Sequence, residues 1–328
     1  MNVTPQKILV LGAGGYVGTS LVPYLLNQGH KIVAFDIFWF GDHFFTSHPN
    51  LKIIQGDIIS FNFSEILKDI DTVIHLACIS NDPSFDLNPE LSKKVNFDST
   101  INLLKQFNQS PIKRLIFASS SSVYGVKKEP LVHEELKSEP ITLYAKYKDE
   151  SEKFLITNKL DHFDLVIIRP ATLCGPSPRL RLDLVSNILA SQAYYNKKIT
   201  IHGGDQYRPQ LNIKEMLKAY EICLNYPKKF QNEIFNFGEI NYTVNDIAEL
   251  VRKLAPHPIL IERQQIADNR SYRISSEKFY QFFNYRPTLL LENALQDLYH
   301  FFQNNPQLDI NKSIYHNVKL MKEINYAP

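Results

Sequence analysis

The sequence of 328 residues lacks the features that define disulfide-linked, zinc-binding or membrane-spanning proteins. Its three cysteines, Cys78, Cys174 and Cys223, are too scattered for a disulfide framework, and no two have the spacing of zinc ligands. No apolar run reaches the roughly 20 residues that a bilayer span needs. We therefore expect reduced thiols, no metal ion and no membrane association.

An excess of charge of one sign is also missing. The 36 Lys and Arg residues nearly balance the 34 Asp and Glu residues, for a formal net charge of +2. This balance excludes the broad basic surface of a nucleic-acid-binding protein, so any anionic ligand must be bound by local groups. The first residues run straight into a strand pattern without a secretory leader, and we expect a cytoplasmic protein.

What the sequence does contain is a regular alternation of short apolar runs and amphipathic stretches. This rhythm predicts an α/β protein with a Rossmann-type doubly wound parallel sheet that helices cover on both faces. The predicted strands are 7–11, 32–35, 51–54, 72–76, 114–118 and 165–168, and the predicted helices are 17–26, 91–107 and 144–155.

The pattern loosens after Arg169-Pro170, in the segment CGPSPRLRLDL. We expect residues 1–170 to form the dinucleotide-binding domain and residues 171–328 a smaller α/β substrate domain, with helices near 184–194 and 213–224. The apolar run 234–237 leaves another arrangement open, in which the segment near 205–240 returns to the first sheet as an added strand.

A glycine loop follows the first strand and opens the first helix. In GAGGYVG, Gly12, Gly15 and Gly18 stand where a tight turn and close approach to a pyrophosphate require glycine. Asp36 ends the second strand, where a carboxylate accepts hydrogen bonds from the adenosine ribose and repels a 2′-phosphate. The cofactor predicted is therefore NAD. Asp57, in IIQGDI, is a further candidate, for the adenine.

Tyr144 and Lys148 are four residues apart at the start of a predicted helix, so their side chains share one face. A neighbouring ammonium and the positive nicotinamide ring favour the phenolate, which makes Tyr144 a proton acceptor for an alcohol that is being oxidised. Ser120, in FASSSSVYG at a strand end, is expected to hydrogen-bond the same substrate oxygen. Each motif alone has an ordinary structural explanation, but their combination indicates a dehydrogenase.

Together these motifs resemble the extended short-chain dehydrogenase/reductase family, in particular its NAD-dependent nucleotide-sugar epimerases and dehydratases. The resemblance covers almost the whole chain, and its VYG motif selects Ser120 among the four serines. It implies that Ser120, Tyr144 and Lys148 are catalytic. It also implies the following cofactor-binding residues: Gly12, Gly15, Tyr16, Val17, Gly18, Asp36, Asp57, Ile58, Leu76 and Ala77 of the HLA motif, Asn96, Tyr144 and Lys148.

The resemblance also implies a nucleotide-diphosphate sugar as substrate. Arg208, in QYRPQLNI, and Arg270, in DNRSYRIS, match the arginines that bind the diphosphate, and bidentate contacts to phosphate suit arginine. Arg179 and Arg181 are further candidates for the same anion. The other substrate-binding residues implied are Ser80, Ser120, Ser121 and Thr172.

Two departures from the family pattern bear on the reaction. Dehydratases carry an Asp-Glu pair after the catalytic residue, where this chain has Ser121 and Ser122, which disfavours dehydration. Thr172 replaces the usual asparagine of the sixth-strand motif. We therefore expect oxidation at C4 of the sugar by an epimerase acting through a 4-keto sugar.

Two alternatives to the epimerase stay open at this point. The segment SPRLRLDL resembles a subgroup that includes GDP-heptose 4-dehydrogenases, so a net dehydrogenase or a 4-ketoreductase is one of them. The other is a dinucleotide-binding protein without catalysis, which leaves Ser120, Tyr144 and Lys148 unexplained.

The family also implies a homodimer through the helices at 91–107 and 144–155.

Overall fold

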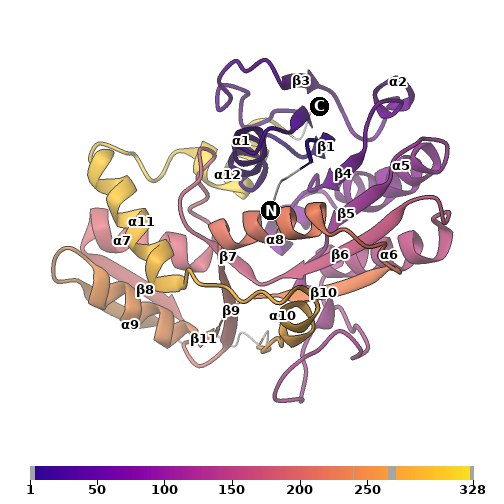
Figure 1. Cartoon of the computed structure of the whole chain (residues 1–328). Helices are drawn as coiled ribbons and strands as arrows, with labels where there is room; N and C mark the ends of the chain where they lie inside the picture. The colour runs from indigo at the N-terminus through magenta and orange to yellow at the C-terminus, as the bar shows by residue number, and fades with distance from the viewer. Residues whose placement is uncertain (1–3, 239, 265–270, 326–328) are drawn as a thin grey trace.

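The centre of the molecule is a seven-stranded sheet in which all neighbouring strands run parallel (Figure 1). The computed structural model describes residues 4–238, 240–264 and 271–325. Across the sheet, the strands are β10 (Glu233–Phe237), β6 (Asp164–Pro170), β5 (Arg114–Ala118), β4 (Thr72–His75), β1 (Lys7–Leu11), β2 (Lys31–Asp36) and β3 (Leu51–Gln55). The predicted doubly wound α/β class is confirmed, and the run at 234–237 lies in the edge strand β10.

Helices cover both faces of the sheet because its strands are apolar on both sides. In β1, Ile8 and Val10 belong to one apolar core, whereas Leu9 and Leu11 belong to the other, as the alternation of side chains along a strand requires. The first core is covered by α1 (Gly18–Asn27), α8 (Ile213–Asn225) and α10 (Glu277–Phe283), and the second by α2 (Ser64–Leu67), α5 (Ser99–Asn108) and α6 (Leu143–Asn158).

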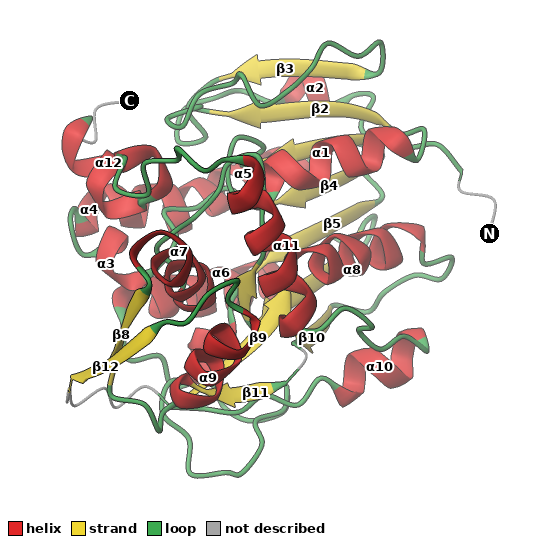
Figure 2. Ribbon diagram, turned by 90° about the vertical axis from the view of Figure 1, so that its left-hand side faces the viewer, coloured by secondary structure: helices red, strands yellow, loops and turns green. Residues whose placement is uncertain are grey.

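A smaller α/β part with its own apolar core lies beside the sheet (Figures 1 and 2). Its core consists mainly of side chains from α7 (Val185–Asn196), α9 (Val244–Leu254) and α11 (Leu291–Asn304). Two small sheets complete it, one with the order β11 (Asn241–Thr243), β9 (Tyr207–Asn212) and β7 (Thr172–Cys174), the other pairing β12 (Leu260–Gln264) with β8 (Lys198–His202).

Short helices surround the carboxyl edge of the large sheet. The stretch predicted as one helix at 91–107 is helical throughout, but a π-helical segment interrupts its α-helical hydrogen bonding. The short helices are α3 (Asp82–Phe85), α4 (Pro89–Lys93), the π-helix η1 (Lys94–Asp98), the 3₁₀-helices η2 (Ser121–Tyr124) and η3 (Ser313–Tyr315), and α12 (Asn317–Glu323). Helix α12 packs against α3, which brings the end of the described chain to this edge (Figure 2).

One cavity of about 460 Å³ opens at the carboxyl edge of the sheet. The order of the strands reverses between β4 and β1, and open α/β sheets bind ligands at such a point. Residues that follow β1, β2, β4, β5 and β6 line the cavity, together with Thr172 and Arg208 of the smaller part. The fold thus brings distant segments to one site. Among the described residues, no helix is long and apolar enough to cross a membrane.

Candidate active site

The loop between β1 and α1 packs so tightly that two of its positions require glycine. Gly12 has a φ of +85°, and a Cβ there would lie 2.5 Å from the backbone nitrogen of Ala77. A Cβ on Gly18 would lie 2.4 Å from the carbonyl oxygen of Gly12. Because the loop also leads into the first turn of α1, it fits a pyrophosphate bound by backbone N–H groups and the helix dipole. The loop residues that line the cavity are Gly12, Gly15, Tyr16, Val17 and Gly18.

Asp36 lies at the end of β2 and also lines the cavity. Its Oδ2 accepts a hydrogen bond from the Gly14 N–H at 2.9 Å, and its Oδ1 accepts one from the Phe38 N–H at 2.7 Å. Burial raises the pKa of this carboxyl, although both N–H groups act in the opposite direction. Asp57 and Ile58 lie further along the same wall. These residues fit the adenosine half of NAD.

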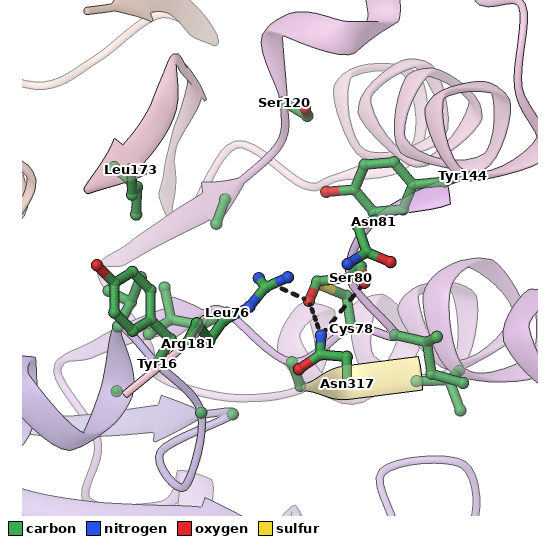
Figure 3. A pocket seen from close by; sticks show the side chains of 18 of the residues that line it. Tyr16, Leu76, Cys78, Ser80, Asn81, Ser120, Tyr144, Leu173, Arg181 and Asn317 are labelled. Atoms are coloured by element: carbon green, nitrogen blue, oxygen red, sulfur yellow. Dashed lines mark hydrogen bonds between the residues drawn. The ribbon is translucent and has the colours of Figure 1, made fainter. Parts of the chain in front are cut away.

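Ser120, Tyr144 and Lys148, which come from two separate segments, line this cavity together. Ser120 follows β5, and Tyr144 lies near the start of α6 (Figure 3). Lys148 follows one helical turn later on α6. Helix α6 begins there because Thr142 caps it, its Oγ1 accepting a hydrogen bond from the Ala145 N–H at 3.2 Å. The sequence predicted each segment separately, and the fold places them together.

Lys148 and Ser120 are held by backbone contacts. Lys148 is 2% exposed, and its ammonium donates a hydrogen bond to the carbonyl oxygen of Ala118 at 2.7 Å. The Oγ of Ser120 accepts a hydrogen bond from the Ser122 N–H at 3.2 Å and thereby caps η2. Ser120 thus has the capping role that a serine run after a strand suggests, and it faces the cavity as well.

The environment of Tyr144 keeps its phenol protonated in the protein alone. Burial raises the pKa of Tyr144, and Cys78 and Asp82 raise it further. Hydrogen bonding with Ser120 and the charge of Arg181 lower the pKa. The Lys148 ammonium, which we expected to favour the phenolate, is engaged by the Ala118 carbonyl.

The HLA motif and Asn96 occupy different places. Leu76 and Ala77 line the cavity. Asn96 is 4% exposed and does not line the cavity. Its Oδ1 accepts a hydrogen bond from the Ile79 N–H at 2.8 Å, and its Nδ2 donates one to the Ile79 carbonyl oxygen at 3.0 Å. Asn96 therefore supports the loop after β4 from outside the cavity. His75 is buried beside Lys148, and burial followed by this charge lowers its pKa to about 3.

The predicted substrate residues are described except for one. Arg270 lies outside the described residues. The Ser121 hydroxyl lies 3.1 Å from the hydroxyl of Tyr272, which packs against the first apolar core of the large sheet and also lines the cavity. The predicted substrate residues that line the cavity are Ser80, Ser120, Ser121, Thr172, Arg179, Arg181 and Arg208.

Some cavity residues carry no signal that the sequence reasoning used. Asn317 stands at the start of α12, far along the chain, and no motif surrounds it. Asp82 does not belong to any helix that the sequence predicted. Phe40 belongs to the aromatic stretch 38–45, which ordinary packing explains. Asp183 forms an ion pair with Arg181 at 2.8 Å. Its place two residues after Arg181 in the same segment is the one feature of the sequence that could have indicated this pair.

Comparisons with known proteins agree with this geometry. A family profile described as "NAD dependent epimerase/dehydratase family" matches residues 8–238. The UDP-glucose 4-epimerase of Lactobacillus helveticus is 29% identical over 270 residues, which are 76% of this chain and 82% of that protein. The UDP-glucuronic acid decarboxylase 1 of Arabidopsis thaliana is 27% identical over 91% of this chain and 70% of its own length.

A solved structure is similar over nearly the whole fold. It is the UDP-glucuronic acid 4-epimerase from Bacillus cereus in complex with UDP-glucuronic acid and NAD, with 26% identity and a TM-score of 0.82. The match covers 91% of this chain and 99% of that one. The likeness therefore includes the smaller α/β part as well as the large sheet.

Proposed function

Because the chain belongs to the NAD dependent epimerase/dehydratase family, we propose that it is a 4-epimerase of a nucleotide-diphosphate sugar. The observation that carries the proposal is the meeting of the glycine loop, Ser120, Tyr144, Lys148 and Arg208 in one cavity. The groups that fit the cofactor, a proton acceptor and an arginine suited to a diphosphate therefore line the same cavity.

The proposed chemistry assigns one role to each catalytic side chain. The Tyr144 phenolate takes the proton from the hydroxyl at C4 of the sugar and later returns it, as a general base and then a general acid. The Ser120 hydroxyl hydrogen-bonds the same oxygen, and the Lys148 ammonium holds the nicotinamide ribose. NAD held by the glycine loop, Asp36 and Lys148 would supply the acceptor for the hydride of C4 and the donor for its return. In an epimerase, the 4-keto sugar turns within the site before the hydride returns to its other face.

The residues beside Ser120 favour epimerisation over dehydration. Elimination of water across the sugar ring needs an acid and a base near the ring. The two positions after Ser120 are Ser121 and Ser122, and a serine hydroxyl is neither an acid nor a base at neutral pH. Relatives that are named as 4-epimerases of UDP sugars support the same choice of reaction and make UDP the first nucleotide to test.

One experiment separates the possible outcomes. The purified chain is incubated with UDP-glucose, UDP-glucuronic acid and a set of GDP sugars, each with and without 2-oxoglutarate as a second oxidant, and NMR follows the sugars. We expect an isomer at C4 to form without added cofactor. A ketosugar that forms only with the keto acid would indicate a net dehydrogenase of the GDP-heptose type. If the protein retains NAD and converts none of the sugars, the proposal is wrong.

The pH dependence of the reaction tests the environment of Tyr144. Because the phenol must lose its proton to act as a base, the rate falls as the pH drops through its pKa in the ternary complex. Asp82 raises that pKa, so Asp82→Asn is expected to move the acidic limb of the kcat profile to lower pH. Asparagine keeps the oxygen that accepts the Thr142 hydroxyl at 2.6 Å.

The control for this prediction is Glu90→Gln, since Glu90 lies on α4 with its side chain 81% exposed and pairs with Lys94 at the start of η1. It removes one negative charge outside the cavity and should leave the profile in place. A shift of the Asp82→Asn limb to higher pH, or equal shifts in both variants, would contradict the assignment of Tyr144 as the titrating base.

Two further properties belong to the proposal. We place the protein in the cytoplasm, which the three free cysteines support. We also propose a homodimer formed through α4, η1, α5 and α6. Within one chain these elements pack together, and the rings of Phe97 and Phe154 meet edge to face with centroids 6.3 Å apart. Light scattering on the purified chain measures the oligomeric state, and a monomer would contradict the dimer.

A further inference from the structure

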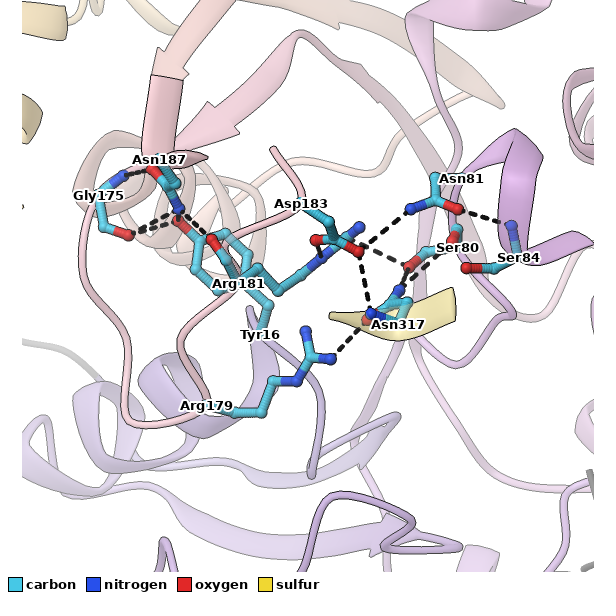
Figure 4. A network of polar contacts seen from close by, with 10 residues as sticks. All are labelled: Tyr16, Ser80, Asn81, Ser84, Gly175, Arg179, Arg181, Asp183, Asn187 and Asn317. Carbon is cyan, nitrogen blue, oxygen red and sulfur yellow. Dashed lines mark hydrogen bonds and ion pairs between the residues drawn. The ribbon is translucent and has the colours of Figure 1, made fainter. Parts of the chain in front are cut away.

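The segment after β7 crosses over the start of α1 and is fastened there. The Tyr16 hydroxyl donates a hydrogen bond to the carbonyl oxygen of Gly175 at 2.6 Å, and the Ser177 hydroxyl donates one to the carbonyl oxygen of Tyr16 at 2.6 Å. The Arg179 N–H donates to the Thr19 hydroxyl at 3.2 Å. These contacts place residues 175–183 directly against the glycine loop (Figure 4).

Arg179 is buried in the cavity wall, with 2% of its surface exposed. Its guanidinium carbon lies 3.6 Å from the centroid of the Phe40 ring, and its Nη2 donates a hydrogen bond to the side-chain oxygen of Asn317. Its buried Nε has no hydrogen-bond partner within the described part of the chain. The side chain therefore has donor capacity left for a ligand.

Arg181 lies next to it and is also buried, with 7% of its surface exposed. Its Nε donates to Asp183 at 2.8 Å, and its Nη1 donates to the Ser80 hydroxyl at 3.2 Å. Its buried Nη2 has no partner among residues 4–238, 240–264 and 271–325. Figure 3 shows the guanidinium in the cavity, on the side of Ser80.

The charges of the pair are incompletely compensated. Arg181 pairs with Asp183, whereas Arg179 has no ion pair in the described residues. Burial and the neighbouring Arg181 lower the pKa of Arg179 to about 9, although Asp183 and Asp36 act in the opposite direction. A buried cation without a counterion is costly, so such a group is expected where an anion binds.

We propose that Arg179 and Arg181 bind the diphosphate of NAD, with Asn317 as the residue that positions Arg179. This inference rests on the proposed function, since it takes NAD as the cofactor. It assigns the two arginines to the cofactor, whereas the sequence suggested the diphosphate of the substrate.

The location of the arginines favours the cofactor over the substrate. The segment that carries them is bonded to Tyr16 and Thr19, which belong to the loop and helix that bind a pyrophosphate in this type of fold. A dianionic diphosphate between this loop and the two guanidiniums would use their remaining donors, and charge-assisted bonds of this kind are the strong ones.

Asn317 connects three parts of this arrangement. Its side-chain oxygen accepts from Arg179, its Nδ2 donates to the Ser80 hydroxyl at 2.9 Å, and its N–H donates to Asp183 at 3.0 Å. Helix α12 is thereby fastened to the cofactor site through one residue. The C-terminal helix is thus a part of the site that holds Arg179 toward the cavity.

The test measures binding of NAD, ADP-ribose and adenosine to the full chain by calorimetry after removal of any retained cofactor. Arg179→Met and Arg181→Met are each expected to weaken NAD and ADP-ribose about 10- to 100-fold, the range for the loss of a charge-assisted hydrogen bond. Adenosine, which lacks the diphosphate, should bind as it does to the original chain. Asn317→Ala should show the same pattern with a smaller loss.

Arg208→Met is the matched control, since it removes an arginine of the same cavity that lies on β9. It should weaken UDP and leave NAD unchanged, the reverse of Arg179→Met. Thermal melting separates binding from folding. Without cofactor, Arg179→Met should melt at or above the melting temperature of the original chain, because a buried unpaired charge is gone. Added NAD should raise the melting temperature of this variant less than that of the original chain.

Two results would overturn the inference: NAD affinity in the Arg179 and Arg181 variants within twofold of the original value, or a loss confined to UDP. The second result would return both arginines to the substrate. A failure of the proposed function looks different, because the original chain would then convert none of the sugars in the NMR assay, whatever its affinity for NAD in the calorimeter.

Discussion

Tyr144→Phe is expected to lower kcat by about 10³-fold, within the range measured for loss of a general base, while NAD stays bound. Phenylalanine keeps the ring that packs in the cavity and removes the hydroxyl that accepts the proton. The residues that fit NAD, including Asp36 and the glycine loop, are untouched. The NMR assay measures turnover, and calorimetry measures NAD affinity on the same preparation.

Tyr147→Phe is the control for this variant. Tyr147 lies on the same helix, but its ring stacks on Phe85 with centroids 5.6 Å apart, and its side chain does not line the cavity. This variant should turn over the sugar normally. Undiminished activity in Tyr144→Phe would defeat the mechanism, and equal losses in both variants would point to damage to α6.

A second large effect is expected from Glu152→Gln, which should reduce the free energy of unfolding by about 3 to 5 kcal/mol. The Glu152 and Arg169 side chains are 1% and 6% exposed, and Arg169 binds both carboxylate oxygens, with the shortest N–O distance 2.5 Å. Burial alone would lower the pKa of Arg169, but Glu152 raises it above its usual range. The substitution therefore leaves a buried guanidinium without its counterion.

Glu277→Gln tests whether burial causes the loss. Glu277 also pairs with an arginine, Arg286, but the side chains of that pair are 51% and 62% exposed, so water replaces the lost partner. Chemical denaturation of both variants measures the two effects. A loss in Glu277→Gln comparable to that in Glu152→Gln would show that burial is not the cause.

The Glu152 network also bears on the active site. Glu152 lies one helical turn after Lys148 on α6, and it accepts a hydrogen bond from Ser119, the residue before Ser120. Arg169 further bonds the Tyr124 hydroxyl at 2.8 Å at the end of η2. The network thus joins the two segments that carry the catalytic side chains, so activity in Glu152→Gln should fall before global unfolding begins.

The features that the sequence predicted well depend on short stretches of chain. The strands of the large sheet have clear apolar patterns because both of their faces are buried, and β1 begins and ends where the pattern indicated. Gly12 and Gly18 are recognisable because backbone crowding at those positions admits no side chain. Asp36, Tyr144 and Lys148 follow from their positions at a strand end or on one helix face.

The sequence was less informative where contacts join distant segments. Thr172 and Arg208 reach the cavity because β7 and β9 pair in a small sheet beside the large one. Asn96 matched a family motif, but only the fold shows that it bonds the backbone of Ile79 instead of lining the cavity. The protonated state of Tyr144 in the protein alone likewise depends on burial and on Asp82, which comes from another helix.

The sequence by itself therefore determined the class of fold and the cofactor, and it predicted the three catalytic residues, because each depends on local spacing and periodicity. Tertiary structure decided which charges face which ligand. The sequence made Arg179 and Arg181 candidates for binding an anion, but their place beside the glycine loop follows from hydrogen bonds to Tyr16 and Thr19 and from Asn317 of α12. Such contacts between distant residues arise only when the separate elements pack together.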